Sequence, residues 1–535
     1  MSALTLPVNP YPRDGWFDSQ YRLFGRFPGE DDYTPIAVPA VLYKIVHWLA
    51  LLAGVDLKGE LYLASLAQNS LLFLSACFVY YTCKYASPSK VAGFVAVAFL
   101  LFILSTGLAQ AFWSENVTLA MFAAVLYLNT KIYYEQTQST SCFWRRAFSS
   151  SLLTGLLVIT RMIPALLIPA VAFLLYGRHS HKRLVSYTAL ACLTTGLLAG
   201  GMLASNYARF GRAEITNSSG RHLWQGVTPI VDTALAESPE FQELEALNPR
   251  IQSKNWYEIR LPDDGRRAFD GEQLFGRLAS EAIRSHPFLY LRLGLSKFAT
   301  TIWGAPYALG SDSKGSHHVL AADPLTADRP LPPLGGSLLT LPTRVVAAGA
   351  DALKAVLSLG QLVYPIAIFF VLATYSALTL QTTRPSGTQH VSRSRIAATV
   401  KYARSLHALF GGLLLGAIYL SDIPHPRLTR GLCALILLLQ VAMLGGDDAR
   451  MRQEARGSSG KLVVYTFLAL MFFGSLWLSW QVETGNARNV LPYSPFLSVM
   501  LAISLAYWFN VAEERGVVAA EGHRAGASGS IRSRR

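Results

Sequence analysis

Apolar runs constrain this chain more than any other feature. Runs of about 20 residues, the length that spans a bilayer core, alternate with short basic segments along most of the 535-residue sequence. Charged residues make up only 15% of the chain, whereas a soluble globular protein carries about 25%. The sequence therefore predicts an all-α polytopic membrane protein.

The basic residues indicate how the chain is threaded. The formal net charge is +14, but Lys and Arg cluster between the apolar runs, where the positive-inside rule explains them better than nucleic-acid binding does. We therefore expect a lipid bilayer as partner and no nucleic acid. We expect about 11 membrane-embedded helices, plus an interfacial element over 36–54, at these positions: 61–83, 91–110, 117–129, a hairpin over 151–176, 184–205, 354–380, 406–421, 429–445, 462–480 and 492–510.

The expected hairpin carries an arginine in the middle of an apolar run. Residues 151–176 hold Thr160-Arg161-Met-Ile-Pro164, with basic flanks at 145–146 and 178–183. We expect the first flank to be a loop together with Lys131. Because both flanks read as cytoplasmic, the run must enter and return, which places Arg161 near the tip on the outer side.

The alternation of apolar runs with polar segments divides the chain into regions. We expect an outer acidic loop and interfacial helix over 1–60, a first transmembrane bundle over 61–205, and a large periplasmic loop with juxtamembrane helices over 206–340. A second bundle over 341–515 and a flexible basic tail over 516–535 follow. Within the large loop, residues 270–298 predict an amphipathic helix and a break at His286-Pro287. A second helix is expected to lie along the membrane, with Arg292 and Lys297 near the headgroups.

Four polar groups converge on the outer face in this topology. They are the acidic stretch Asp14–Asp32, the turn at Glu115, the tip at Arg161, and the large loop, which Arg488 faces. Carboxylates serve as a general base or metal ligands, and Arg and His bind phosphate. Charged groups at membrane depth are costly and usually functional.

Each candidate also has a structural interpretation. Asp18 reads equally as a solvated loop acid, and Glu30 and Asp31 follow Pro28-Gly29 as an exposed turn. Glu115 in the first turn of a helix complements the helix dipole, and Arg161 can extend to the headgroups. The glycines around Arg221-His222 suit an anion but also a polar loop, and Asn116-Val-Thr118 matches the glycosylation sequon, a frequent chance match.

The order of these motifs resembles the GT-C superfamily of polyprenyl-phosphate-sugar-dependent glycosyltransferases. In particular, it resembles the family-39-like bacterial enzymes related to protein mannosyltransferases and lipid A aminoarabinose transferases. The matching pieces are Asp18-Ser-Gln-Tyr21, Ser114-Glu115, the segment Gly155–Pro164 with Thr-Arg-x-x-Pro, Gly220–Gly226, and Arg488-Asn-Val-Leu-Pro492-Tyr-Ser-Pro495. Two departures are that members begin with a span ahead of the acidic loop, and that Asn489 stands where many have Tyr.

The resemblance implies a GT-C type enzyme, a hexosyl or pentosyl transferase acting at the periplasmic face of the cell (inner) membrane. It implies a polyprenyl-phosphate-linked sugar donor and a glycan, lipid or protein acceptor. Asp18 is then the catalytic base, with Glu30 or Asp31 as substitutes. Glu115, Arg161, Arg221, His222 and Arg488 are the candidate substrate contacts. Some relatives use a divalent metal; no cofactor is certain here.

Three alternatives stay open. An O-antigen ligase or polymerase-like enzyme also has many spans, a large outer loop and lipid-pyrophosphate substrates, and favours Arg and His over an N-terminal acid. A catalytically degenerate family member fits the unusual start. A transporter is disfavoured because the chain shows no matched pair of interrupted helices.

Overall fold

A computed structural model shows that the described parts of the chain are helical and contain no strand. The described residues are 37–55, 57–87, 89–104, 114–135, 139–161, 163–176, 179–211, 213, 215, 219–227, 230–231, 233–247, 265–304, 367–368, 370–375, 377–378, 461–476, 478 and 492–508. Three stretches within these helices are long and apolar enough to cross a membrane: Leu66–Ala86, Glu115–Tyr134 and His181–Ala208. The described residues thus form an all-α fold in which three helices have the length and apolar composition to cross a membrane, and they do not test the expected total of 11 membrane helices.

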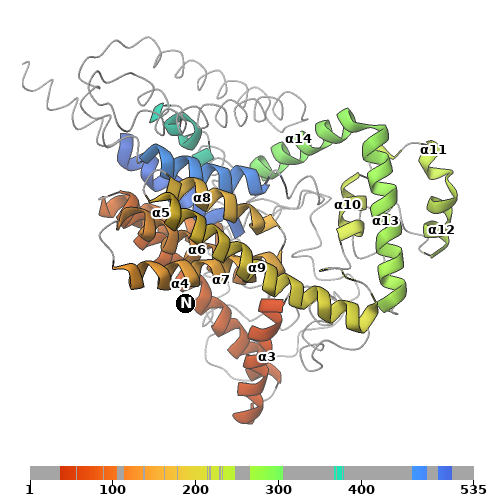
Figure 1. The fold of residues 1–535 in the computed structure, drawn as a ribbon, viewed down its shortest axis with the longest axis horizontal. Coiled ribbons are helices and arrows are strands. Elements are labelled where there is room, and N and C mark those ends of the chain that lie inside the picture. The colour runs from red at the N-terminus through yellow and green to blue at the C-terminus, as the bar shows by residue number, and fades with distance from the viewer. Residues whose placement is uncertain are drawn as a thin grey trace, which may run out of the picture.

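The first helices form one side of a bundle (Figure 1). Helix α3 covers Ala37–Leu52, α4 Leu57–Ala86, α5 Lys90–Leu104 and α6 Ser114–Tyr134. Helix α4 packs on both α5 and α6. The ends of α4 and α6 meet, because the Tyr85 hydroxyl donates to Glu135 Oε1 at 2.7 Å.

The expected hairpin is confirmed, with Arg161 between its two legs. Helix α7 runs over Thr140–Thr160, and the return leg consists of a 3-10 turn, η2, Ile163–Leu166, and α8, Leu167–Tyr176. The return leg ends beside the start of α7, since the rings of Phe143 and His179 lie 5.5 Å apart. Pro164 is placed in the first turn of the return leg, where its missing N–H breaks no helical hydrogen bond.

The start of the hairpin differs from the expectation. The prediction of a loop holding Lys131, Arg145 and Arg146 is wrong, because Lys131 belongs to the last turn of α6 and both arginines lie in α7. Ser139 starts α7 early by accepting a hydrogen bond from the Cys142 N–H at 3.3 Å, as a good N-cap does. The outward leg is consequently longer than expected.

Helix α9, His181–Phe210, follows the hairpin and packs on α7 and α8. Ser180 caps its start, and Gly211, with φ +71°, ends it with a bond from its N–H to the Tyr207 carbonyl. That left-handed conformation favours glycine. Within α7, Gly155 allows close contact with α9: an added Cβ would lie 2.8 Å from Leu198 Cδ1 and 3.3 Å from Thr195 Cα.

Buried polar residues join α6, α7 and α9. The Tyr187 hydroxyl on α9 lies 2.9 Å from Asn129 Oδ1 on α6 and 2.8 Å from Ser150 Oγ on α7. Asn129 Nδ2 also donates to Ser150 Oγ at 2.8 Å. Interhelical hydrogen bonds of this kind stabilise helix association in membranes, and sequence periodicity gives no sign of them.

The C-terminal segments complete the same core. Residues 367–378, 461–476 and 492–508 contribute buried side chains to the core that α3 to α9 form. Phe122 of α6 packs its ring 5.3 Å from Tyr493 and 5.5 Å from Phe496. A π-helical turn, η6, Leu470–Gly474, touches the hairpin's return leg, since a Cβ at Gly474 would lie 3.1 Å from Leu166 Cδ2.

A second, smaller core lies beyond one end of the bundle (Figure 1). It is built by α10, Ser219–Val227; α11, Thr233–Ala236; α12, Pro239–Leu247; α13, Gly265–Ser285; and the start of α14, Pro287–Gly304. Trp224 is fully buried at its centre, 5.8 Å from the Phe241 ring and 6.3 Å from that of Phe275. The predicted break at His286-Pro287 is confirmed. Lys297, however, donates to the Gly226 carbonyl at 2.8 Å, so it ties α14 to α10.

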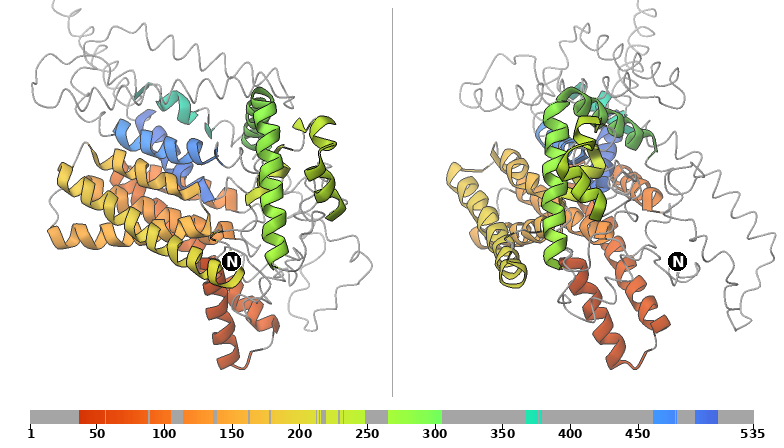
Figure 2. Two further views of the ribbon diagram at one scale, coloured as in Figure 1. Left: turned by 45° about the vertical axis from the view of Figure 1, so that its right-hand side comes forward. Right: turned by 90° about the vertical axis from the view of Figure 1, so that its right-hand side faces the viewer.

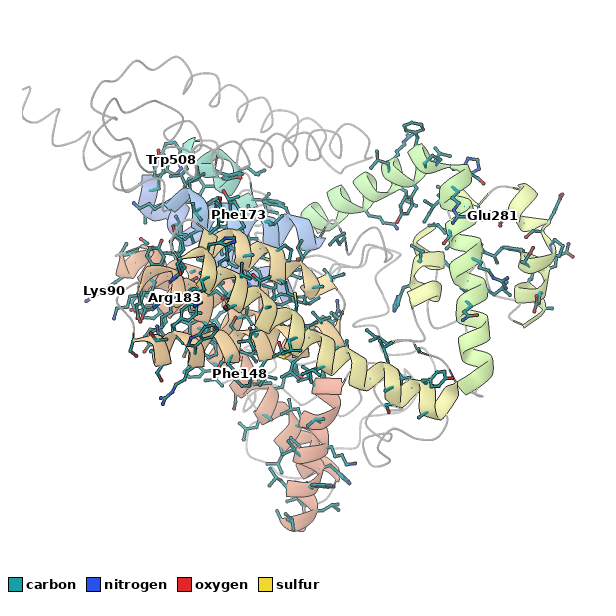
Figure 3. All side chains as sticks on the ribbon, viewed as in Figure 1. Lys90, Phe148, Phe173, Arg183, Glu281 and Trp508 are labelled. Carbon is teal, nitrogen blue, oxygen red and sulfur yellow. The ribbon has the colours of Figure 1, made fainter. Side chains whose placement is uncertain are left out.

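The two ends of the bundle therefore differ. We use "basic end" for the end with Tyr85, Lys131, Glu135 and Arg146, and "Arg161 end" for the opposite one. Helix α6, with 21 residues, separates the two by about 30 Å. Figure 3 places Lys90 at the basic end and Glu281 on α13 beyond the Arg161 end, and the left view of Figure 2 shows the α13 unit beside the bundle.

Candidate functional site

A buried ion pair marks the Arg161 end. Arg161 Nη2 lies 2.5 Å from Glu115 Oε1. The Glu115 side chain is 4% exposed and that of Arg161 16%. The two residues come from different helices and stand 46 positions apart in the chain, so the hairpin is what brings them together.

The helix ends favour these two charges individually. Glu115 lies in the first turn of α6, and Arg161 is the residue that caps the end of α7. A carboxylate at a helix N-terminus and a cation at a C-terminus each complement the helix dipole. Arg161 adopts an extended conformation, φ −151° and ψ 134°, and its N–H still bonds to the Leu157 carbonyl at 2.8 Å. The backbone thus leaves the helix where the guanidinium meets the carboxylate.

Burial makes the pair mutually dependent. Removing two charges from water is costly, and their attraction and hydrogen bonding offset that cost only when both are present. A guanidinium carries five N–H donors in a planar fork, a geometry that matches both carboxylate and phosphate oxygens. The arrangement is therefore chemically suited to bind a second anion such as a phosphate, with Glu115 holding the arginine in place.

The basic end carries a comparable ion pair in a different setting. Glu135 Oε2 accepts from Arg146 Nη1 at 2.6 Å, and Lys131 Nζ lies 3.9 Å from Glu135 Oε1. Partial desolvation opposes ionisation of Glu135, but hydrogen bonds from Tyr85 and Arg146 and the nearby positive charges outweigh it, so the pKa of Glu135 is lowered. This cluster joins α4, α6 and α7 and is a structural counterpart to the pair at the Arg161 end.

The C-terminal segment packs on α6 in the half of that helix that begins at the Arg161 end. Tyr493 packs on Phe122, which is two helical turns, about 10 Å, from Glu115. The described part of this segment begins at Pro492, four positions after Arg488 in the sequence. Arg488 itself lies outside the described residues.

The other predicted residues divide into two groups. Arg221 and His222 lie on α10, which is on the bundle side of α13 in Figure 1; His222 is half-buried, and the side chain of Arg221 is not among those described. Asp18, Glu30 and Asp31 lie outside the described residues. Among the residues that are described, no three His, Cys, Asp or Glu side chains come together as a metal site would require.

The direct pairing of Glu115 with Arg161 was missed by sequence reasoning. A signal existed, since the sequence placed one acid and one arginine at the same outer ends of adjacent apolar segments. The structure also bears on the glycosylation sequon at Asn116. The Asn116 side chain is fully buried at the start of α6. In the folded protein Asn116 is therefore inaccessible to a glycosylating enzyme.

In comparisons with protein-family models, curated proteins and solved structures, nothing matches this chain.

Proposed function

We propose that the protein is a membrane glycosyltransferase of the GT-C type, which moves a sugar from a polyprenyl-phosphate donor to an acceptor at the outer, periplasmic face of a cell membrane. The order of motifs resembling that superfamily motivates the proposal. The observation that carries it is the buried Glu115–Arg161 pair at the tip of a helical hairpin, opposite the basic end.

The pair supports the proposal because it supplies what a phosphate leaving group needs. In the proposed reaction an acceptor hydroxyl attacks the anomeric carbon while the bond between that carbon and the phosphate oxygen breaks. The phosphate leaves with the bonding electrons, and a cation fixed beside it stabilises the growing charge. Arg161 takes this role, and Glu115 is a positioning residue that keeps the guanidinium oriented.

The acceptor proton needs a base within hydrogen-bond reach. We assign that role to Asp18, with Glu30 and Asp31 as substitutes, on the strength of the resemblance. Arg221, His222 and Arg488 remain proposed contacts to the phosphate or sugar. A divalent metal, if used, would draw its oxygen ligands from the acidic residues of the Asp14–Asp32 stretch.

The test compares two ion pairs of the same protein. The full chain is purified into lipid nanodiscs and given polyprenyl-phosphate-linked sugars, and release of polyprenyl phosphate is followed. Arg161→Gln should lower kcat/KM by about 10²-fold or more, the scale of losing one stabilising contact to transition-state charge. Arg146→Gln, which removes the matching arginine at the basic end, should change kcat/KM less than about twofold once the folded fraction is equal.

The remaining variants and donors separate the alternatives. Loss of turnover in Asp18→Asn, with folding intact, supports the assigned base. Turnover with polyprenyl-pyrophosphate donors alone would favour the ligase-like enzyme instead. Equal losses from Arg161→Gln and Arg146→Gln would show that the arginine at the hairpin tip has only a structural role.

A further inference from the structure

Helix α9 lies on the outside of the bundle. Only 6% of the most apolar part of the candidate span His181–Ala208 is buried, against 78% for Glu115–Tyr134. Figure 1 and the right view of Figure 2 agree, since both show α9 at the outer surface of the bundle. Most of this helix is therefore available to contact the surroundings of the protein.

The outer side of α9 is an apolar stripe that ends in a lysine. Val185, Leu193 and Leu197 are 51%, 59% and 68% exposed, and Lys182 is exposed as well. At 100° per residue these four side chains fall within an arc of about 120°. Tyr187, on the opposite side of the helix, is buried. The apolar stripe thus runs along α9 from Lys182 at the basic end.

Two cations at the start of α9 keep their full charge. Lys182 and Arg183 lie in its first turn and, within the described part of the chain, neither forms an ion pair. The Arg183 guanidinium lies 5.4 Å from the centre of the Phe143 ring, a cation–π contact that holds it between α9 and α7. This contact neutralises no charge. Figure 3 shows Arg183 at the same end of the bundle as Lys90.

These cations do not stabilise α9 itself. The first turn of a helix favours acidic side chains, because the helix dipole is positive there, yet the first turn of α9 holds His181, Lys182 and Arg183 and no acid. The positive-inside rule accounts for cations at this end of the bundle in general. It does not account for two of them at the head of an exposed apolar stripe.

The stripe and the cations together match the two parts of one phospholipid. Leu193 lies about 17 Å from Lys182 along the helix axis, and half of the hydrocarbon core of a bilayer is about 15 Å thick. A phosphate beside Lys182 and Arg183 consequently places its acyl chains alongside Val185 and Leu193 within the same leaflet. The phosphate supplies the negative charge, and the chains cover the apolar side chains.

A second copy of the chain is the competing occupant of the stripe. Gly196 and Gly200 form a Gly-x-x-x-Gly spacing, and an added Cβ at either would meet nothing within 4 Å; this spacing lets membrane helices approach closely. Two copies in one membrane, however, are related by an axis along the membrane normal, so their stripes would meet in parallel. The two Lys182 side chains would then face each other and repel. An anionic lipid has the opposite charge at that level.

We propose that the outer side of α9 is a binding site for an anionic phospholipid. Its phosphate pairs with Lys182 and Arg183, and an acyl chain lies along Val185 and Leu193 toward Leu197. Selection of a charged headgroup at this one helix goes beyond the general expectation of a bilayer around the bundle. Because the site lies at the basic end, it is independent of the proposed transferase activity.

Quenching by spin-labelled lipids measures which lipid contacts α9. The full chain is prepared in a cysteine-free background, in which the five native cysteines are replaced by alanine. Val185→Cys carries a fluorophore and is placed in nanodiscs with a rising proportion of doxyl-labelled phosphatidylglycerol or doxyl-labelled phosphatidylcholine. Phe73→Cys, which is exposed in the middle of α4, is the matched control for the rest of the bundle surface.

Phosphatidylglycerol should half-quench the label on Val185→Cys at a mole fraction about fivefold lower than phosphatidylcholine, the scale of one cation beside an anionic headgroup. On Phe73→Cys the two lipids should differ by less than about twofold. Lys182→Gln/Arg183→Gln should remove the preference. Lys84→Gln/Lys90→Gln removes two exposed cations at the same end and should retain it. Lys182→Gln alone is used if the first double variant has a lower thermal midpoint.

Four results would overturn the proposal. The first is equal half-quenching by the two lipids on Val185→Cys, or a preference of the same size on Phe73→Cys. The second is an equal loss of preference in Lys84→Gln/Lys90→Gln, which would assign the preference to the charge of the whole basic end. The third is loss of the preference on adding sodium phosphate at constant ionic strength, which would show that the cations bind free phosphate. The fourth is no quenching by either lipid, which would show that protein covers the stripe.

Discussion

Glu115 and Glu135 each form an ion pair with an arginine that follows α6 in the chain, at opposite ends of that helix. The first pair is nearly excluded from solvent, with side chains 4% and 16% exposed, whereas Glu135 is 32% exposed. Coulomb interactions strengthen as the local dielectric falls, so the two pairs should respond differently to mutation even though their geometry is similar.

Neutralising one member of the buried pair should be costly. Glu115→Gln leaves the Arg161 guanidinium buried without its countercharge, and we expect a loss of about 3 kcal/mol in the free energy of unfolding. The double variant Glu115→Gln/Arg161→Met buries no charge and should recover much of that loss. Chemical unfolding in lipid, analysed as a double-mutant cycle, measures the coupling. If the decrease in the free energy of unfolding of the double variant equals the sum of the decreases in the two single variants, Glu115 and Arg161 are not coupled.

Glu135 should make stability depend on pH. Its folded pKa is lowered, so the stabilisation it provides is complete above the unfolded value of about 4.3 and is lost as pH falls through the lower folded value. We expect Glu135→Gln to be less stable than the wild type by about 1 kcal/mol at pH 7, because partial exposure screens the pair. Thermal midpoints of both proteins between pH 7 and pH 3 should converge as the pH falls. A constant difference would contradict the assignment.

At the scale of elements, packing between α7 and α9 depends on one glycine. An added Cβ at Gly155 would lie 3.3 Å from the Thr195 backbone as well as close to Leu198. We expect Gly155→Ala to cost about 1–2 kcal/mol, since overpacking forces the helices apart. Gly200→Ala on α9 is the matched control, because a Cβ there meets nothing within 4 Å and alanine favours a helix by up to about 1 kcal/mol. The free energies of unfolding of the two variants, measured in the same lipid, distinguish them. Equal changes in Gly155→Ala and Gly200→Ala would show that α9 does not pack closely on Gly155.

Sequence reasoning succeeded for elements whose boundaries have a local cause. Pro287 separates α13 from α14, and the basic flanks require the hairpin at Arg161 to return. It failed where a side chain acts on a distant partner. Lys297 was expected at the headgroups but binds the Gly226 carbonyl, and Tyr187 binds Asn129, a pairing set by helix packing. The start of α7 was also missed, because the Ser139 cap lies within a segment rich in polar residues.

At the scale of the whole molecule, the candidate site was predicted in part. The sequence placed Glu115 and Arg161 on one side of the membrane, and the fold joins them at 2.5 Å. That joining requires the full path of α6, the turn to α7 and the hairpin tip, which no local pattern encodes. The places of Asp18, Glu30, Asp31 and Arg488 stay predictions, because these residues lie outside the described part of the chain.

The two ends of the molecule should also differ in their access to water on the two sides of the membrane. Lysines and arginines gather at the basic end, and such residues remain on the cytoplasmic side, so the unit around α13 should face outward. Single cysteines at Lys90 and Glu281, both exposed, test this in the cysteine-free background with a membrane-impermeant maleimide. In right-side-out vesicles, Glu281→Cys should react at once, and Lys90→Cys only after permeabilisation.

The reverse labelling pattern would put Glu115, Arg161 and the α13 unit on the cytoplasmic side. A periplasmic transferase would then be excluded, although the ion pair itself would be unaffected. Labelling of both cysteines in sealed vesicles would instead show that the two ends share one side, which the length of α6 forbids if that helix spans the bilayer. The orientation therefore decides whether the buried pair can meet an outward-facing lipid-linked sugar, and it can be measured without knowing the donor.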